Sequence, residues 1–292
     1  MFARILSLSA ALAGCLFLVL ATPAQAQMRV CGPGEQPVAF DNNVNPPVPL
    51  CPGGGPAAAP VAESHAAMAW HEDAADVWVD GAYTGRNSRA ESNALAACAR
   101  VMGEGCKVAG SWGNSTLYVY RNRFGDFFAA YSANSAGIKK AEADCKGKGI
   151  LPCERIMKFA SNKREHFPGQ EVRKRYLAAA WVNGKEGYDG KLYIASGQPT
   201  YKAAEDAAVS ACRKANAGRE CMLQSFSGNG VLQIYQPNED SGAVVDNTPD
   251  RAVKAAKAWC KQMKARTCIL GPQYDARTPG LFVHDFKAGD AK

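Results

Sequence analysis

In this chain of 292 residues, cysteine is the residue type whose spacing is most informative about possible chemistry. Structural zinc sites favour cysteines two to four residues apart, usually together with histidine, and a cysteine nucleophile needs a free thiol beside a base. Ten of the eleven cysteines follow residue 30, and most form pairs eight or nine residues apart. An even count at such spacing predicts disulfides, although the count alone does not fix the connectivity. The pairs that we expect are Cys98 with Cys106, Cys145 with Cys153, Cys212 with Cys221, Cys260 with Cys268, and Cys31 with Cys51.

Other residue types offer little chemistry. Of the four histidines, only His71 is followed by two acidic residues, Glu72 and Asp73. This cluster lacks the HExxH spacing that places two ligands on one helical face. The chain has no G-x-S-x-G motif for a serine nucleophile and no glycine-rich phosphate loop between a strand and a helix. We therefore assign no catalytic, cofactor-binding or metal-binding residue and expect no cofactor. Paired carboxylates are the one enzymatic basis left open, because their separation in space is invisible in the sequence.

Residues 1–26 have the order of a secretory signal peptide. Arg4 precedes an apolar run over residues 5–20, and Ala24 to Ala26 supply a small-residue cleavage site. The run is too short for a confident membrane span, so we expect no transmembrane segment after cleavage. A competing interpretation takes Leu12 to Cys15 as a lipobox, with lipidation at Cys15. We predict a soluble periplasmic or secreted protein, with a lipoprotein as the alternative.

The regular recurrence of the cysteine pairs indicates an internal duplication. Cysteines 98, 106, 145 and 153 correspond to cysteines 212, 221, 260 and 268 with offsets of 114 or 115 residues. A constant offset over so many positions predicts two related modules, which we place at residues 64–162 and 176–286. Residues 27–63 form a leader and linker rich in Cys, Pro and Gly, which cannot bury enough apolar surface to fold alone. Residues 163–175 are expected to be a solvated basic linker, and residues 287–292 a tail.

Each half of a module is expected to hold two strands, a helix and a further strand. Alternating apolar residues, as in Asp76 to Tyr83 (DVWVDGAY) and Thr116 to Arg121 (TLYVYR), predict strands. The turns that join the half-units, Gly113 to Ser115 and Gly228 to Gly230, have residues typical of tight hairpins. The predicted fold class is α+β. It consists of two tandem modules, each a mainly antiparallel sheet with two helices on one face.

The helices have start signals and a shared packing face. Ser88, with Glu91 three residues later, predicts a capping box, and Thr248 before Pro249 marks another start. Small residues recur four and eight positions before each helical cysteine, which places them on one face of the helix. We expect this face to lie close against a sheet, with each disulfide joining the end of a helix to the next strand.

These motifs resemble the exported bacterial family known as domain of unknown function 4189. The resemblance rests on the AAAW strand at Ala178 to Trp181, the SRAESNALAAC helix at Ser88 to Cys98 and the cysteine that follows it. It also rests on the leader CGPGEQPV and CPGGGP, which begins at Cys31. Membership implies an exported or periplasmic globular domain without an assigned reaction. The tandem arrangement departs from the single copy of the family.

Binding is the function that the sequence favours. Exposed aromatic residues on an open sheet face would make a binding surface, and the candidates are Trp70, Trp78, Trp112, Trp181 and Tyr193. The formal charge is +7, and residues 163–175 carry five basic against two acidic side chains, a run that could also meet an anionic surface. We predict an exported non-catalytic protein that binds a protein or envelope component, one form being an inhibitor or immunity-like protein, and we expect no nucleic-acid partner. The alternatives are a peptidoglycan hydrolase and a purely structural envelope protein.

Overall fold

The computed structural model describes residues 39–41, 48–50, 63–85, 87–132, 135–169, 172–182 and 189–287. The chain divides into two compact units, Met1–Val61 and Ala62–Lys292. In the first unit, β1 (Ala39–Asp41) pairs with β2 (Val48–Leu50) in an antiparallel ladder. The predicted signal peptide, the lipidation alternative at Cys15 and the pairing of Cys31 with Cys51 all lie outside the described residues.

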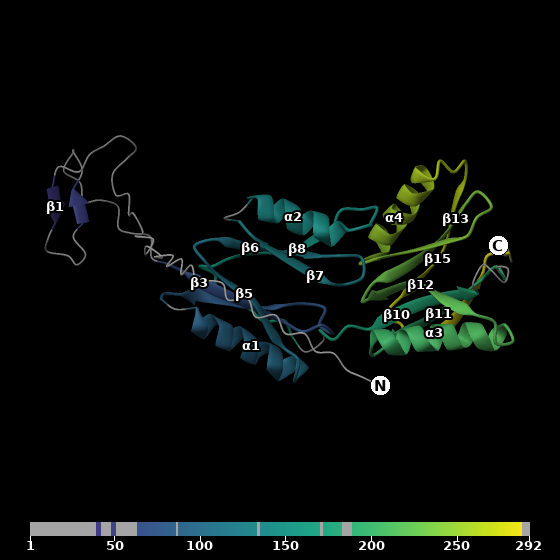
Figure 1. The fold of residues 1–292 in the computed structure, drawn as a ribbon, viewed down its shortest axis with the longest axis horizontal. Helices are drawn as coiled ribbons and strands as arrows, with labels where there is room; N and C mark the ends of the chain where they lie inside the picture. Colours follow the sequence, from purple (N-terminus) through teal and green to yellow (C-terminus); the bar gives the residue numbers. More distant parts are fainter. Residues whose placement is uncertain are drawn as a thin grey trace, which may run out of the picture. The chain divides into compact units, whose positions relative to one another are not determined.

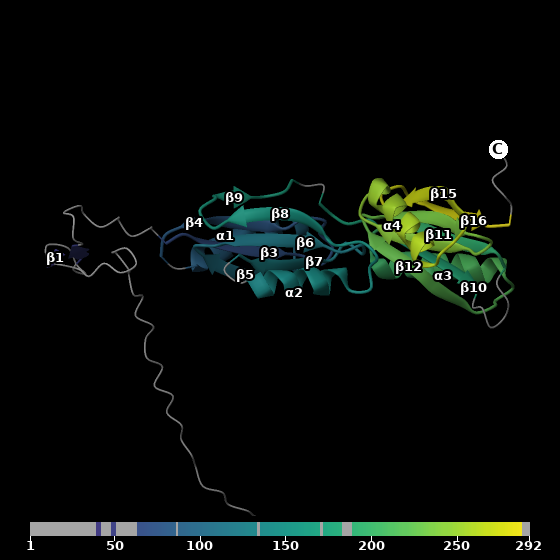
Figure 2. The ribbon, with the colours of Figure 1, turned by 90° about the horizontal axis from the view of Figure 1, so that it is seen from above.

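The second unit contains both predicted modules, and the elements of each module lie together (Figure 2). The first module holds β3 (His65–Trp70), β4 (Trp78–Tyr83), α1 (Ser88–Met102), β5 (Lys107–Gly113), β6 (Thr116–Arg121), β7 (Phe127–Tyr131), α2 (Ser135–Lys146), β8 (Glu154–Ala160) and β9 (Glu165–His166). The second holds β10 (Tyr176–Val182), β11 (Lys191–Gln198), α3 (Tyr201–Ala215), β12 (Cys221–Gly228), β13 (Val231–Pro237), β14 (Gly242–Asp246), α4 (Pro249–Gln262), β15 (Cys268–Asp275) and β16 (Gly280–Asp285). The α+β class and the repeated β-β-α-β order are confirmed.

Each module has two antiparallel sheets where we expected one. The strand orders are β5-β3-β4-β9 and β7-β6-β8 in the first module, and β12-β10-β11-β16 and β14-β13-β15 in the second. In both modules the sheets face each other and the two helices cover the outer faces, so the helices lie on opposite sides (Figure 1). The expected placement of both helices on one face is therefore corrected.

The turns between the half-units explain this difference. Asn114 and Asn229 have positive φ values of 47° and 55°, as tight-turn residues often do. Each turn, however, carries the chain from a strand of one sheet to a strand of the other, because β5 does not pair with β6 and β12 does not pair with β13. The two turns thus have residues typical of a hairpin, but each of them connects two different sheets.

The core of each module has one part between the sheets and one under the first helix, and the second module has a further part under α4. Along β10, successive residues alternate between the first two of these parts. Ala178 and Ala180 pack towards α3, whereas Leu177 and Ala179 pack between the sheets. A strand buried on both faces reads as a nearly continuous apolar run, which accounts for the LAAAW sequence.

The four predicted helix-to-strand disulfides are confirmed. They join Cys98 to Cys106, Cys145 to Cys153, Cys212 to Cys221 and Cys260 to Cys268, with Cα–Cα distances of 5.9 to 6.1 Å. The predicted small-residue face is buried on three helices, with Ala94, Ala208 and Ala256 each 0 % exposed. On α2 the cysteine is buried but Ala141 is only half-buried.

The helix starts match the sequence signals only in part. The Thr248 hydroxyl accepts a hydrogen bond from the Arg251 amide at 3.3 Å, as an N-cap residue does. On α1, however, the N-cap is Asn87, which makes no side-chain capping bond, and Ser88 is already helical. The Ser88 hydroxyl therefore cannot cap the helix, and the predicted capping box is not formed.

The basic segment 163–175 also differs from the expected solvated linker. Within it, β9 pairs with β4, Val172 is 7 % exposed against the core under α1, and Lys174 is 5 % exposed. Arg173 donates to the Met102 carbonyl at 2.8 Å. Over its described residues the segment is therefore folded against the first module. Val172, which lies between the charged residues, packs into the core, and the number of charges gives no indication of such packing.

Over the described part of the chain, the helices are too short or too polar for any of them to cross a membrane.

Candidate binding groove

Most of the aromatic residues expected on a binding surface lie in the core. Trp78 is 0 % exposed, Tyr193 3 % and Trp112 5 %. Trp70 and Trp181 are half-buried against the cores between the sheets. The prediction is therefore corrected for Trp78, Trp112 and Tyr193, because strands covered on both faces leave no open sheet face for them.

Trp181 lines an open groove at one end of the second module. The groove holds about 1240 Å³ of space, part of which is open to solvent. Its apolar lining comes from β10, β12, β13 and the residues that follow α4 and β16, namely Trp181, Val182, Met222, Tyr235, Pro237, Met263 and Phe286. Met222 and Met263 are each 46 % exposed. Apolar side chains that converge on a concave site are typical of binding sites.

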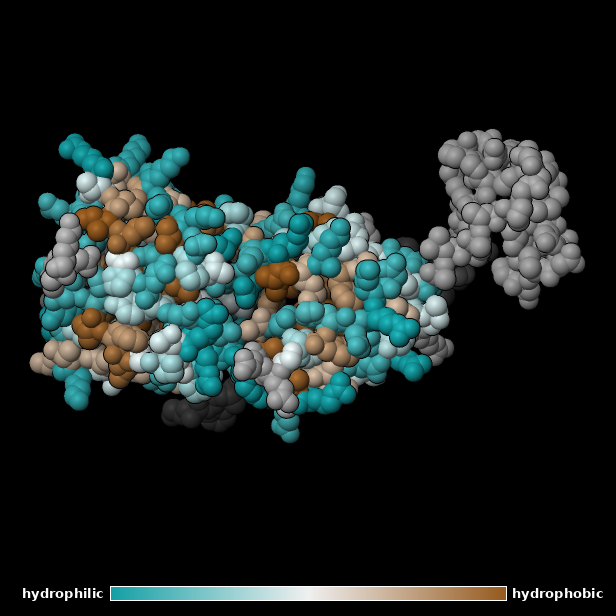
Figure 3. Space-filling model, turned by 180° about the vertical axis from the view of Figure 1, so that it is seen from behind, coloured by the Kyte–Doolittle hydropathy of each residue, from teal (hydrophilic) through white to brown (hydrophobic). Residues whose placement is uncertain are grey.

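The concave shape matters because isolated apolar residues are common on protein surfaces. On the face shown in Figure 3, hydrophobic residues form small patches scattered among hydrophilic ones. The apolar residues of the groove come from separate elements and line one space.

One side of the groove is formed by the acidic loop between β13 and β14. Glu239 and Asp240 line the groove and are exposed. Asn238 stands before them with a positive φ of 58°. Its side-chain oxygen accepts from the Arg266 and Thr267 amides at 2.8 and 3.3 Å, which ties the loop to the segment after α4. The groove therefore combines an apolar lining with two carboxylates of this loop, and the cationic residue Lys287 also lines it.

The duplication shows that the groove is a property of the second module. With the offset of 115 residues, Met222 corresponds to Lys107 and Met263 to Lys148. Both lysines are exposed, like the methionines at the equivalent places. The second module thus presents two exposed apolar side chains where the first presents two cations.

In the first module, the loop equivalent to the acidic loop is covered by the second module. The Phe124 carbonyl accepts from the Gly228 amide and the Arg123 carbonyl from the Ser227 hydroxyl, both at 3.0 Å. The Phe124 ring stacks on Phe226 with a centroid distance of 4.8 Å. This end of the first module is occupied within the chain.

A buried polar cluster strengthens the module junction. The Tyr176 hydroxyl donates to an Asp73 carboxylate oxygen at 2.8 Å, and the Lys174 ammonium donates to the Glu72 carbonyl at 2.8 Å. Burial lowers the pKa of Lys174 and raises that of Tyr176, because desolvation disfavours each charged form. Both side chains are held by hydrogen bonds across the junction, so their shifted pKa values are explained by packing.

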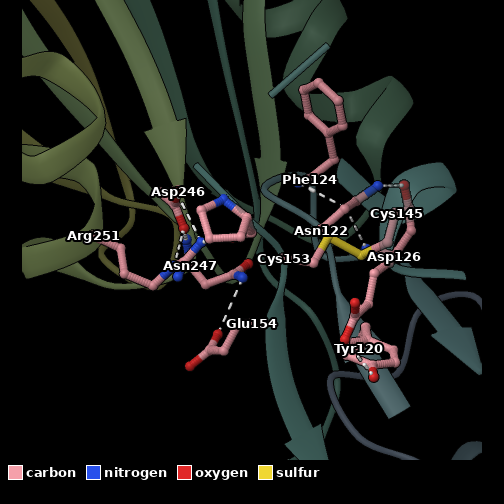
Figure 4. The surroundings of a disulfide bond; sticks show 12 residues. Tyr120, Asn122, Phe124, Asp126, Cys145, Cys153, Glu154, Asp246, Asn247 and Arg251 are labelled. Carbon is pink, nitrogen blue, oxygen red and sulfur yellow. Dashed lines mark hydrogen bonds and ion pairs between the residues drawn. A yellow bond between two sulfur atoms is a disulfide. The ribbon is translucent and has the colours of Figure 1, made fainter. Parts of the chain in front are cut away.

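A second set of junction contacts surrounds the Cys145–Cys153 disulfide (Figure 4). Asn247 donates to Glu154 at 3.1 Å. Arg251 bonds Asp246 at 2.7 Å and also donates to the Pro152 carbonyl at 2.8 Å. The short loop closed by this disulfide is therefore part of the contact between the modules.

The histidine cluster considered for chemistry is structural. The His71 Nδ1 accepts from the Asp73 amide at 3.0 Å, so its Nε2 donates to the Glu104 carbonyl at 3.1 Å. Both ring nitrogens thus form hydrogen bonds with backbone groups. In the part of the chain that the structure describes, no group of three or more His, Cys, Asp or Glu side chains is placed to hold a metal ion.

The groove is thus the feature of the described residues best suited to binding, and of its lining only Trp181 was predicted from the sequence. Met222 and Met263 were missed, and their one signal in the sequence is that the duplicated half has Lys107 and Lys148 at the equivalent positions. No protein-family model, curated protein or solved structure matches the chain, so the likeness to domain of unknown function 4189 stays a sequence-based prediction.

Proposed function

We propose that the protein is an exported, non-catalytic binding protein of the bacterial envelope, and that the groove of the second module holds a segment of a protein partner. An inhibitor of an envelope-targeting protein is one form of this function. The observation that carries the proposal is the exposure of Met222 and Met263 in a concave site where the sister module has lysines.

The lining favours a polypeptide segment with apolar side chains. Methionine is unbranched and polarisable, so it adapts to ligands of irregular shape. Trp181 adds a large apolar surface, as anchors at protein interfaces commonly do. The exposed carboxylates Glu239 and Asp240 would attract a basic residue beside the apolar ones.

Two further observations support the proposed location and the proposed binding end. The four disulfides are consistent with an oxidising compartment outside the cytoplasm. The junction between the modules covers the end of the first module that corresponds to the groove. The groove end of the second module is therefore the one left for a partner.

The test replaces the two methionines with the residues of the sister module. The variant Met222→Lys/Met263→Lys should fold normally, since both side chains are partly in solvent, and should lose affinity for the partner about tenfold or more through desolvation of the new charges. The partner is sought by cross-linking in an envelope extract, and its affinity is then measured with purified components.

The matched control is Lys107→Met/Lys148→Met, which makes the reverse exchange in the first module and should leave affinity unchanged. Equal capture by the wild type and the groove variant would contradict the proposed site. Release of muropeptides from peptidoglycan by the purified protein would contradict its non-catalytic character and favour the hydrolase alternative.

A further inference from the structure

The outer surface of α4 and the turn after it carry unusual charge. Residues 249–267 contain six Lys or Arg and one Asp, a net charge of +5, whereas the whole chain has +7. Five of these side chains are exposed and form what we call the α4 basic stripe: Lys254, Lys257, Lys261, Lys264 and Arg266.

The lysines of the stripe share one face of the helix. Residues three and four apart are neighbours on a helix surface, and Lys254, Lys257 and Lys261 follow this spacing. Lys264 and Arg266 continue the stripe in the turn after α4. The three lysines on the helix therefore form a row about 10 Å long at 1.5 Å per residue.

No ion pair involves the stripe among the described residues. On the other helices the exposed lysines are mixed in this respect, since Lys140 pairs with Asp144 and Lys202 with Asp206, whereas no ion pair is formed by Lys139, Lys146 or Lys214 among the described residues. Like charges at this spacing destabilise a helix. The stripe thus opposes the stability of α4, and no ion pair within the described protein offsets this.

The first module extends the positive surface. Lys146 at the end of α2 and Leu151 after it line a small cavity together with Arg251 of α4, so this end of α2 and the segment that follows lie beside α4. Lys146 and Lys148 are both exposed. In Figure 1, α2 and α4 lie on the same side of the two modules, away from α1 and α3.

We propose that the α4 basic stripe binds the surface of a membrane that contains anionic phospholipids. Lysine ammonium groups act as point charges without the planar fork of arginine, which suits a diffuse layer of lipid phosphates. Stacking on single-stranded nucleic acid requires exposed aromatic rings, whereas Trp259 on α4 is half-buried against the core under that helix. Binding of this kind adds attraction with each basic residue near the surface and is screened by salt.

The experiment measures co-sedimentation of the full chain with vesicles of phosphatidylcholine containing phosphatidylglycerol. We expect binding at about 50 mM salt, loss of binding at about 500 mM salt, and none to pure phosphatidylcholine. The variant Lys257→Glu/Lys264→Glu should bind on the order of thirtyfold more weakly. It should keep its melting temperature, because a carboxylate at position 257 would face Lys254 and Lys261, and the equivalent residue of α2 is already acidic, Glu142.

The control Arg100→Glu/Lys214→Glu changes the net charge equally, at exposed positions on α1 and α3, and should bind vesicles like the wild type. Equal weakening of both variants would overturn the proposal, since net charge alone would then explain the binding. The proposal would also be overturned if the wild type bound a duplex oligonucleotide but no anionic vesicle at the same salt.

Discussion

At the scale of single residues, the junction and the groove differ in how they treat polar groups. Junction side chains such as Lys174 and Tyr176 are buried and held by hydrogen bonds. Groove side chains such as Met222 are exposed and apolar. Polar side chains are usually exposed and apolar ones usually buried, so both sets are in unusual environments. Buried polar groups are stable only with partners, whereas exposed apolar groups in a concavity favour association.

His166 on β9 gives a pH-dependent contact that can be tested directly. Its Nε2 lies 3.1 Å from Asp76, and this hydrogen bond raises the pKa of His166 above 6.5. Because the folded protein favours the protonated form, the added stability is fully present below pH 6.5 and is lost as pH rises through the folded pKa. The free energy of unfolding of the wild type should therefore exceed that of Asp76→Asn by more at about pH 5.5 than at about pH 8.5, as measured by urea denaturation.

The variant His166→Gln serves as the control, since it removes the titrating group. Its own difference from the double variant His166→Gln/Asp76→Asn should stay constant over that pH range. A wild-type advantage that does not change with pH would contradict the assigned ion pair.

At the scale of elements, the two helix starts make a matched comparison. Thr248 caps α4 with its hydroxyl, whereas Ser88 lies inside α1 and makes no capping bond. Thr248→Ala should lower the free energy of unfolding by about 1 kcal/mol, the usual value for an N-cap. Ser88→Ala should change it by less than about 0.5 kcal/mol, as surface changes commonly do. Equal losses in chemical denaturation would show that Ser88 has a capping role in solution.

The sequence was sufficient for elements whose cause is local. Cysteine spacing, alternation and small-residue faces indicated the disulfides, the strands and the docking of three helices. The number of sheets was not predictable in this way, because the turns at Asn114 and Asn229 have the residues of a hairpin but connect strands of different sheets. The groove depends on tertiary placement, since Met222 and Met263 lie far apart in the chain and look like ordinary core residues in the sequence.

At the scale of the whole molecule, the modules are joined by specific close contacts that leave little room for side chains. Gly125 has a positive φ of 88°, and a Cβ there would lie 2.5 Å from the Gly228 carbonyl oxygen. Such a distance requires the junction to shift. The junction should therefore couple the unfolding of the two modules.

The substitution Gly125→Val should make the two modules unfold independently. We expect one calorimetric transition for the wild type and two for the variant, because the contacts of Phe124 with Gly228 and Phe226 would be lost. The control is Gly85→Val, which has a similar φ of 95° but no atom within 4 Å of the added Cβ. It should lower the melting temperature through backbone strain alone and keep a single transition. Two transitions in the wild type would contradict the coupling.

The four disulfides each close a loop within one half-unit, and none of these four links the two modules. Each of their cysteines therefore has as its partner a direct neighbour in the order of cysteines along the chain. In the export that we propose, the first thiol of each of these pairs would emerge and meet its correct partner before any thiol of the following pair appears. Oxidation in order of emergence yields the native connectivity, so maturation should depend on an oxidant of thiols and hardly on an isomerase that rearranges wrong pairs.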